Sequence, residues 1–190
     1  VDIPLIKYVA KKNKPIIIST GNANLDEIYS AVEAAKKSNG GVALLHCISS
    51  YPASPDKFNL KTINFLKKEF NLPIGLSDHS TGINIAIAAI AIGACIIEKH
   101  FILNNKIKSP DSKFSMLPVD FSDLCLMSNI IWKSIGKNEV IINNEEKQNL
   151  KFRRSLYFKK DMYKGEVINE QSIFRKRPNI GLSPIYYDKI

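Results

Sequence analysis

The chain has 190 residues, of which 45% are hydrophobic and 24% are charged, and its formal charge is +9. These proportions are typical of a globular protein with one domain, or one domain and a small addition. No apolar run reaches the roughly 18 residues of a membrane span. The lysines are spread along the sequence and are not gathered with aromatic side chains, so we expect neither a membrane nor a nucleic acid as partner.

The two ends and the cysteines indicate the setting of the chain. It begins V-D-I-P-L-I, with neither an initiator Met nor the regions of a signal peptide, and we expect it to come from the middle of a longer protein. The cysteines are odd in number, form no CxxC pair and each lie in an apolar run, which indicates buried free thiols. A reducing, cytoplasmic location is therefore expected. They are Cys47, Cys95 and Cys125.

Strand and helix patterns alternate along the first 136 residues. Short apolar, β-branched runs predict strands at 15–20, 42–48, 74–77 and 94–101. Helical patterns fill the segments 3–12, 25–38, 59–70, 83–92 and 119–135, with Asn24 as the N-cap of the second. This alternation predicts an α/β fold with a parallel sheet and right-handed crossovers.

Polar residues follow all four predicted strands, which helps to choose between two kinds of α/β fold. No GxGxxG or GxxxxGK[ST] loop is present, so neither nucleotide-binding loop is expected. A ring of polar groups at every carboxyl end favours a barrel, because an open sheet concentrates its site at one switch point. The groups are Ser19-Thr20, His46 with Ser49-Ser50-Tyr51, Ser77-Asp78-His79 and Glu98-Lys99-His100.

His79 and His100 are the candidate metal ligands. They end neighbouring strands 21 residues apart, and each has a carboxylate nearby, Asp78 and Glu98 respectively. Imidazole binds Mn, Fe and Zn, and two ligands leave positions open for substrate oxygens. A histidine at a strand end is also often a simple hydrogen-bonding residue, so the residues alone leave both interpretations open.

Three further candidates carry weaker signals. Cys47 could be a thiol nucleophile beside His46, but we expect His46 to face the barrel interior and Cys47 to pack in the core, since nothing nearby lowers its pKa. Asp111 follows a proline in a loop and could be a general base or an ordinary turn residue. Serine hydroxyls at several strand ends could bind phosphate or carboxylate oxygens.

The character of the sequence changes after Gly136. Residues 137–150 are polar and predict a linker. Residues 151–190 form a different module, in which R-R-S-L-Y-F predicts a strand, Lys164-Gly165 a turn and residues 168–174 a helix.

Five motifs in this order resemble the sialic acid synthase family, and most of all its pseudaminic acid synthase branch. They are K-P-I-I-I-S-T-G, H-C-I-S-S-Y-P, S-D-H-S-T-G, I-E-K-H-F and S-P-D-S-K-F-S. The resemblance implies strands 5–8, the second half of a (β/α)8 TIM barrel, in residues 1–136. A truncated antifreeze-like (SAF) domain would follow in residues 151–190.

The resemblance also implies an activity and roles for particular residues. The family are transferases that condense phosphoenolpyruvate with an N-acetylated amino sugar to a nine-carbon nonulosonic acid, in surface-glycan biosynthesis. His79 and His100 would bind a divalent metal, Mn or Mg. The catalytic residues would be Glu98 and Asp111, which with Tyr51 face the sugar, while Ser49 and Ser77 would contact phosphoenolpyruvate. Arg177 would reach the partner's site in a homodimer with swapped SAF domains.

Several departures from the family pattern leave alternatives open. Ser109 and Asn179 stand where the family usually has glycine, and the lysines that grip phosphoenolpyruvate are absent. A half barrel would also leave two strand edges unpaired, so we expect the chain to be inactive alone. The alternatives are an N-acetylneuraminate or legionaminic acid synthase, or a non-catalytic fragment that acts only with a complementary chain.

Overall fold

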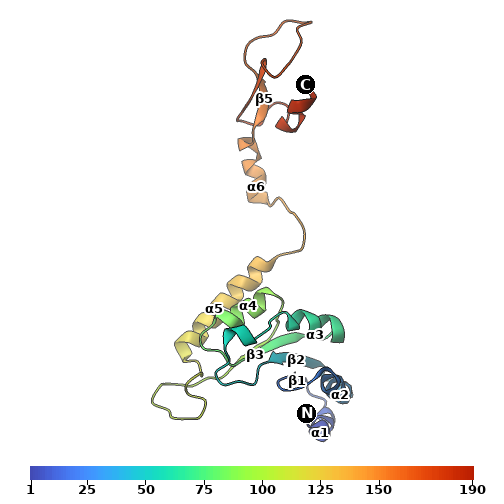
Figure 1. Cartoon of the computed structure of the whole chain (residues 1–190), viewed down its shortest axis with the longest axis vertical. Helices are drawn as coiled ribbons and strands as arrows, with labels where there is room; N and C mark the ends of the chain where they lie inside the picture. Colours follow the sequence, from blue (N-terminus) through green and yellow to red (C-terminus); the bar gives the residue numbers. More distant parts are fainter. The chain divides into compact units, whose positions relative to one another are not determined.

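The computed structural model describes all 190 residues, which divide into two compact units, Val1–Gly136 and Lys137–Ile190. The first unit holds a parallel sheet with its helices and the second holds a small antiparallel sheet (Figure 1). Each unit is described by itself below.

The first unit is built on a four-stranded parallel sheet. Each strand pairs with the next one along the chain, in the order β1-β2-β3-β4. A doubly wound sheet reverses direction at a switch point, whereas a barrel adds every strand on the same side. The strand order is therefore that of half a barrel, as predicted. The strands are β1 (Ile16–Ser19), β2 (Val42–Cys47), β3 (Ile74–Asp78) and β4 (Ile97–Lys99).

Helices connect the strands, and α3 to α5 lie along one side of β3 in Figure 1. The Asn24 side chain caps α2 as predicted, and Glu27 completes a capping box by bonding back to the Asn24 backbone. None of the helices combines the length and apolar character that a membrane crossing requires. The helices are α1 (Ile3–Ala10), α2 (Leu25–Ala35), η1 (Pro55–Lys57), α3 (Thr62–Phe70), α4 (Asn84–Ala91) and α5 (Pro118–Ile135).

The main core lies between the sheet and helices α2 to α4. Every residue of β2 and β3 is buried, and Phe58, in the loop before α3, is among the largest fully buried side chains. Burial of this apolar layer fixes which face of each strand meets the helices, and the opposite face is left to line the interior of the curled sheet. The core includes Ile28, Val32, Leu44, Ile63, Leu66, Phe70, Ile74, Leu76 and Ala89.

The sheet has two open edges, β1 and β4, because neither pairs with a further strand. Ile17 on β1 is 55% exposed, and Phe101 just after β4 is 50% exposed. An apolar hollow of about 530 Å³ lies beside β4 and α5, and Trp132 on its rim is 60% exposed. Apolar side chains of this size are normally covered by another element.

The second unit differs from the prediction in two places. A short helix, α6 (Asn144–Asn149), lies inside the segment predicted as linker, and Asn143 and Glu146 form its capping box. Residues 168–174 are not helical: the Asn169 side chain accepts hydrogen bonds from the backbone of Gln171 and Ser172, which makes a turn. The turn leads into β6 (Ile173–Lys176), antiparallel to β5 (Ser155–Phe158), and the 3-10 helices are η2 (Leu150–Phe152) and η3 (Pro184–Lys189).

Candidate functional site

The register of β3 and β4 places two similar tripeptides side by side. Ser77 pairs with Glu98, and Asp78 pairs with Lys99. Because side chains alternate between the two faces of a sheet, Ser77 and Glu98 share one face and Asp78 and Lys99 share the other. His79 and His100 follow on the first face, with their ring centroids 5.2 Å apart. The two histidines are therefore neighbours at the carboxyl ends of adjacent strands.

These side chains line one hollow of about 300 Å³ on the inner face of the sheet. Every strand contributes to it, and most of the predicted site residues meet there. Its lining contains no Lys or Arg, so the imidazoles are the only side chains lining the hollow that could carry positive charge. The lining residues are Ser19, Gly21, Cys47, Ser49, Tyr51, Ser77, His79, Glu98 and His100.

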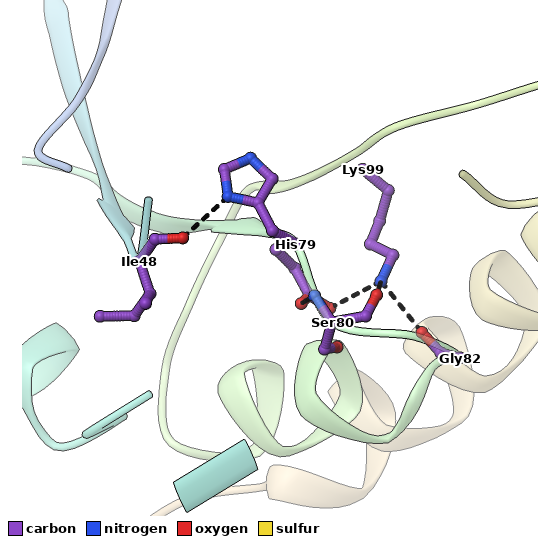
Figure 2. Close-up of polar contacts among 6 residues, drawn as sticks. Ile48, His79, Ser80, Gly82 and Lys99 are labelled. Atoms are coloured by element: carbon purple, nitrogen blue, oxygen red, sulfur yellow. Dashed lines mark hydrogen bonds and ion pairs between the residues drawn. The ribbon is translucent and has the colours of Figure 1, made fainter. Parts of the chain in front are cut away.

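His79 is held in an orientation that suits a metal ligand. It is 5% exposed, and its Nδ1 lies 2.9 Å from the carbonyl oxygen of Ile48, at the end of β2 (Figure 2). A carbonyl can only accept, so Nδ1 carries the proton, and the lone pair of the neutral ring is on Nε2. Ligating histidines commonly donate their second nitrogen to a carbonyl or carboxylate in this way.

His100 has a comparable arrangement with a carboxylate. Its Nδ1 lies 3.4 Å from Oδ2 of Asp111 in the loop after β4. A proton on Nδ1 would again leave Nε2 free. No group of three or more His, Cys, Asp or Glu suited to a metal ion is present. The donor set of this chain thus fits a metal held by two imidazoles, with the remaining positions open.

An aromatic cluster surrounds the two histidines. The Tyr51 ring lies 4.2 Å from His79 and 6.0 Å from His100, between centroids. Phe114 lies 4.9 Å from His100 and 5.5 Å from Tyr51 and is 6% exposed. The sequence analysis missed Phe114, because it is a single apolar residue in a polar loop. Nothing in the sequence of that loop indicates that it folds back onto the histidines. The rings of Tyr51 and Phe114 thus pack against the imidazoles.

Two serines show how the hydroxyls of the hollow are arranged. Ser77 donates a 2.6 Å hydrogen bond to Oε1 of Glu98, which holds both groups on the inner face. Gly21 leaves room for Ser49: a Cβ there would lie 2.2 Å from Ser49 Oγ and 3.0 Å from Cys47 Sγ. Glycine at position 21 is therefore needed for the hydroxyl of Ser49 to take this place.

The predicted directions of His46 and Cys47 were wrong. Asp78, the carboxylate next to His79, does not line the hollow: it lies behind the sheet, paired with Lys99. His46 does not face the interior either, because its Nε2 bonds the carbonyl of Phe58, 2.6 Å away on the helix side. Cys47, one residue further on, consequently points into the hollow and not into the core, with its sulfur 3.9 Å from His79 Nδ1.

Cys47 is expected to be the slowest cysteine to alkylate. Burial raises the pKa of its thiol, mainly by desolvating the thiolate, so the reactive form becomes abundant only at a pH above the ordinary thiol value. Cys95 and Cys125 are exposed. Iodoacetamide labelling near pH 7.5, followed by peptide mass spectrometry, should show Cys47 labelled last. Labelling in urea is the control, and equal native rates for all three would contradict the expectation.

Arg177 lies in the second unit, just after β6. With Arg154, Arg175 and Lys176 it lines a hollow of about 480 Å³. None of these four cations has a carboxylate oxygen within 4.0 Å. Extending the antiparallel register of β5 and β6 by one residue sets Arg154 opposite Arg177, a repulsive arrangement that a bound anion would relieve.

Comparison with known proteins assigns the chain to a family. The NeuB family model matches residues 1–140. The chain is 42% identical to N,N'-diacetyllegionaminic acid synthase of Campylobacter jejuni, over 99% of this chain and 58% of that protein. It is 40% identical to pseudaminic acid synthase of Helicobacter pylori, over 100% of this chain and 56% of that protein. The chain thus spans little more than half the length of these relatives.

A solved structure supports the same assignment. The N-acetylneuraminic acid synthetase of Leptospira borgpetersenii superposes with a TM-score of 0.73 at 36% identity, covering 78% of this chain and 52% of that one. The sequence match, the half-barrel sheet and the paired histidines at its carboxyl end agree with the resemblance seen in the motifs. The chain belongs to the NeuB family.

Proposed function

We propose that this chain supplies half of the active site of a nonulosonic acid synthase, which condenses phosphoenolpyruvate with an N-acetylated amino sugar. The observation that carries the proposal is the hollow in which His79, His100, Glu98 and the serine hydroxyls meet at the carboxyl ends of four parallel strands. The names of the relatives, legionaminic and pseudaminic acid synthases, indicate the class of product.

The proposed reaction joins C3 of phosphoenolpyruvate to the carbonyl carbon of the sugar. Water adds at C2, and the bond from C2 to the phosphate oxygen breaks to release phosphate. A divalent ion, Mn²⁺ or Mg²⁺, held by His79 and His100, would polarise the sugar's carbonyl oxygen. It would also supply the positive charge that the hollow otherwise lacks.

The residues of the chain have distinct roles in this proposal. Ser49 can donate its hydroxyl proton to a phosphate or carboxylate oxygen. Ser77 can do the same when its hydroxyl turns from Glu98 to the substrate. Glu98 is the one acidic side chain in the hollow, and its second oxygen can accept a proton from water or from a sugar hydroxyl. Tyr51 covers the imidazoles and would face the sugar, while Asp111 orients His100 and can reach the open side of the site.

The decisive assay offers the full-length protein phosphoenolpyruvate and each of three amino sugars. These are the precursors of pseudaminic, legionaminic and N-acetylneuraminic acids. Phosphate release and the product mass identify the sugar used; we place the pseudaminic precursor first because of P-D-S-K-F-S and F-R-R-S-L-Y. Absence of phosphate release with all three sugars, with Mn²⁺ or Mg²⁺ present, would overturn the proposal.

Replacing Gly21 with alanine tests the role of Ser49. The added methyl group would displace the Ser49 hydroxyl and press on Cys47, and we expect KM for phosphoenolpyruvate to rise by about 10-fold, because small misplacements of binding groups are costly. Ser134→Ala is the control, since the Ser134 hydroxyl is exposed, bonds only carbonyls of its own helix and does not line the hollow. An unchanged KM in Gly21→Ala would remove Ser49 from the binding site.

For the second unit we propose an antifreeze-like (SAF) fold that places Arg177 in the site of the partner subunit of a homodimer. The support is the uncompensated positive charge around Arg177. If Arg177 acts in the partner's site, Arg177→Gln and His79→Ala are each inactive alone, but their mixture regains activity. In mixed dimers one site has both a normal His79 and a normal Arg177. If the mixed variants form mixed dimers but regain no activity, Arg177 does not act in the site of the partner subunit.

The open sheet edges support a second candidate. The strands of a complementary chain would cover the apolar side chains that are exposed at these edges. They are Ile17, Phe101 and, beside β4, Trp132. In that case these 190 residues are catalytic only in the complex. The test is to purify them alone, and turnover of phosphoenolpyruvate by the isolated chain would exclude this candidate.

A further inference from the structure

A buried ion pair lies directly behind the two histidines. Asp78 precedes His79 and Lys99 precedes His100, and these two residues are opposite each other in the register of β3 and β4. Lys99 Nζ lies 3.1 Å from Asp78 Oδ2. Both side chains are 0% exposed, although the backbone of Lys99 lies on an open edge of the sheet. The pair therefore links the two strands on the face away from the hollow.

Every proton of the Lys99 ammonium has a partner. Besides Asp78, it donates to the carbonyl oxygens of Ser80 at 2.7 Å and Gly82 at 3.0 Å (Figure 2). The other Asp78 oxygen accepts the backbone N–H of Ser80 at 2.8 Å. Lys99 thus binds β3 and both ends of the short loop that leads from His79 into α4.

The energetics of buried ion pairs suggest a role beyond stability. Removing two charges from water costs about as much as their attraction returns, and apolar residues of similar volume often serve as well. A buried pair is best explained where it fixes one arrangement among several. Here Lys99 crosses from one histidine strand to the residues on both sides of the other histidine, so the fixed arrangement is the relative position of the two imidazoles.

We propose that Lys99 and Asp78 are positioning residues, which set the spacing of His79 and His100 for the metal of the proposed site. The inference rests on the proposed function, but it concerns groups that touch neither metal nor substrate. On the inner face, His79 is fixed by Ile48 and His100 by Asp111. These contacts orient each ring separately. The contacts that join the strands behind them are those of Lys99.

The test compares Mn²⁺ affinity in two double variants of the full-length protein. Asp78→Asn with Lys99→Met removes both charges, while asparagine can still accept the Ser80 N–H. We expect Kd for Mn²⁺, measured by electron paramagnetic resonance, to rise by about 10-fold. This is the lower end of the effect of losing an outer partner of a ligand, because neither residue bonds an imidazole directly. Glu33→Gln with Lys36→Met removes an exposed pair and should leave Kd unchanged.

Two further measurements keep the outcomes distinct. Lys99→Arg keeps the charge and serves as the second variant if the double variant does not fold. Its Kd for Mn²⁺ should also rise, since the planar guanidinium group of arginine cannot make the same three contacts as the ammonium group. Hydrogen exchange of the metal-free protein should show faster exchange at residues 79–82 in either variant. Parental Kd together with parental exchange would overturn the positioning role. If the parent protein binds no Mn²⁺, the proposed metal site fails. The hydrogen-exchange rates then decide alone whether Lys99 and Asp78 hold residues 79–82 in place.

Discussion

Replacing His79 or His100 with alanine in the full-length protein should weaken Mn²⁺ binding by more than about 100-fold and abolish metal-dependent turnover. Each variant leaves a single imidazole in a hollow that has no other nitrogen ligand. The loss should exceed the 10- to 100-fold that an outer partner contributes, because a ligand itself is removed. Titration of Mn²⁺ by electron paramagnetic resonance measures binding independently of activity.

His46→Ala is the matched control for these variants. His46 is also a buried imidazole on this sheet, but it bonds Phe58 on the helix side and does not line the hollow. We expect it to lower stability without changing the affinity for Mn²⁺. If His79→Ala and His100→Ala bind the ion as tightly as the parent does, the two histidines are hydrogen-bonding residues and not metal ligands.

The sequence predicted which strands form the site, because that information is local. Short β-branched runs followed by polar residues predicted four strands whose carboxyl ends meet, and the structure has these strands in sequential order. His79 and His100 were brought together correctly for the same reason: both follow adjacent parallel strands. The family motifs then supplied roles that no spacing can give.

The direction of individual side chains was harder to predict. Two carboxylates next to two histidines look alike in S-D-H and I-E-K-H, but only alternation from a known register separates them. Glu98 shares a face with His100 because two positions separate them, whereas Asp78 is one position from His79. His46 and Cys47 are likewise one position apart, so an error in the face assigned to His46 also reverses the direction predicted for Cys47.

The errors in the second unit have a different physical cause. Residues 168–174 have local helix potential, but pairing with β5 overrides it, and the Asn169 turn starts the strand. The segment before it contained a usable signal that was overlooked. Asn143 followed three residues later by Glu146 is a capping box, and it predicts a helix start inside an otherwise polar stretch.

The buried pair behind the histidines leads to the second large effect. Lys99→Ala should destabilise the protein by about 3–5 kcal/mol, the typical result of removing one partner of a buried ion pair. It would leave the Asp78 carboxylate in a fully buried place with one hydrogen bond, and the carbonyls of Ser80 and Gly82 without theirs. Urea unfolding followed by circular dichroism measures the change.

The surface lysine Lys36 provides the control. Both side chains of its ion pair with Glu33 are exposed, and Lys36→Ala should change stability by less than about 1 kcal/mol. Adding Asp78→Asn to Lys99→Ala should then recover part of the lost stability, since the buried, unpaired charge of the Asp78 carboxylate accounts for most of the destabilisation. A loss that is no greater in Lys99→Ala than in Lys36→Ala would mean that water reaches the pair. Lys99 and Asp78 could not then fix the strands that carry the two histidines.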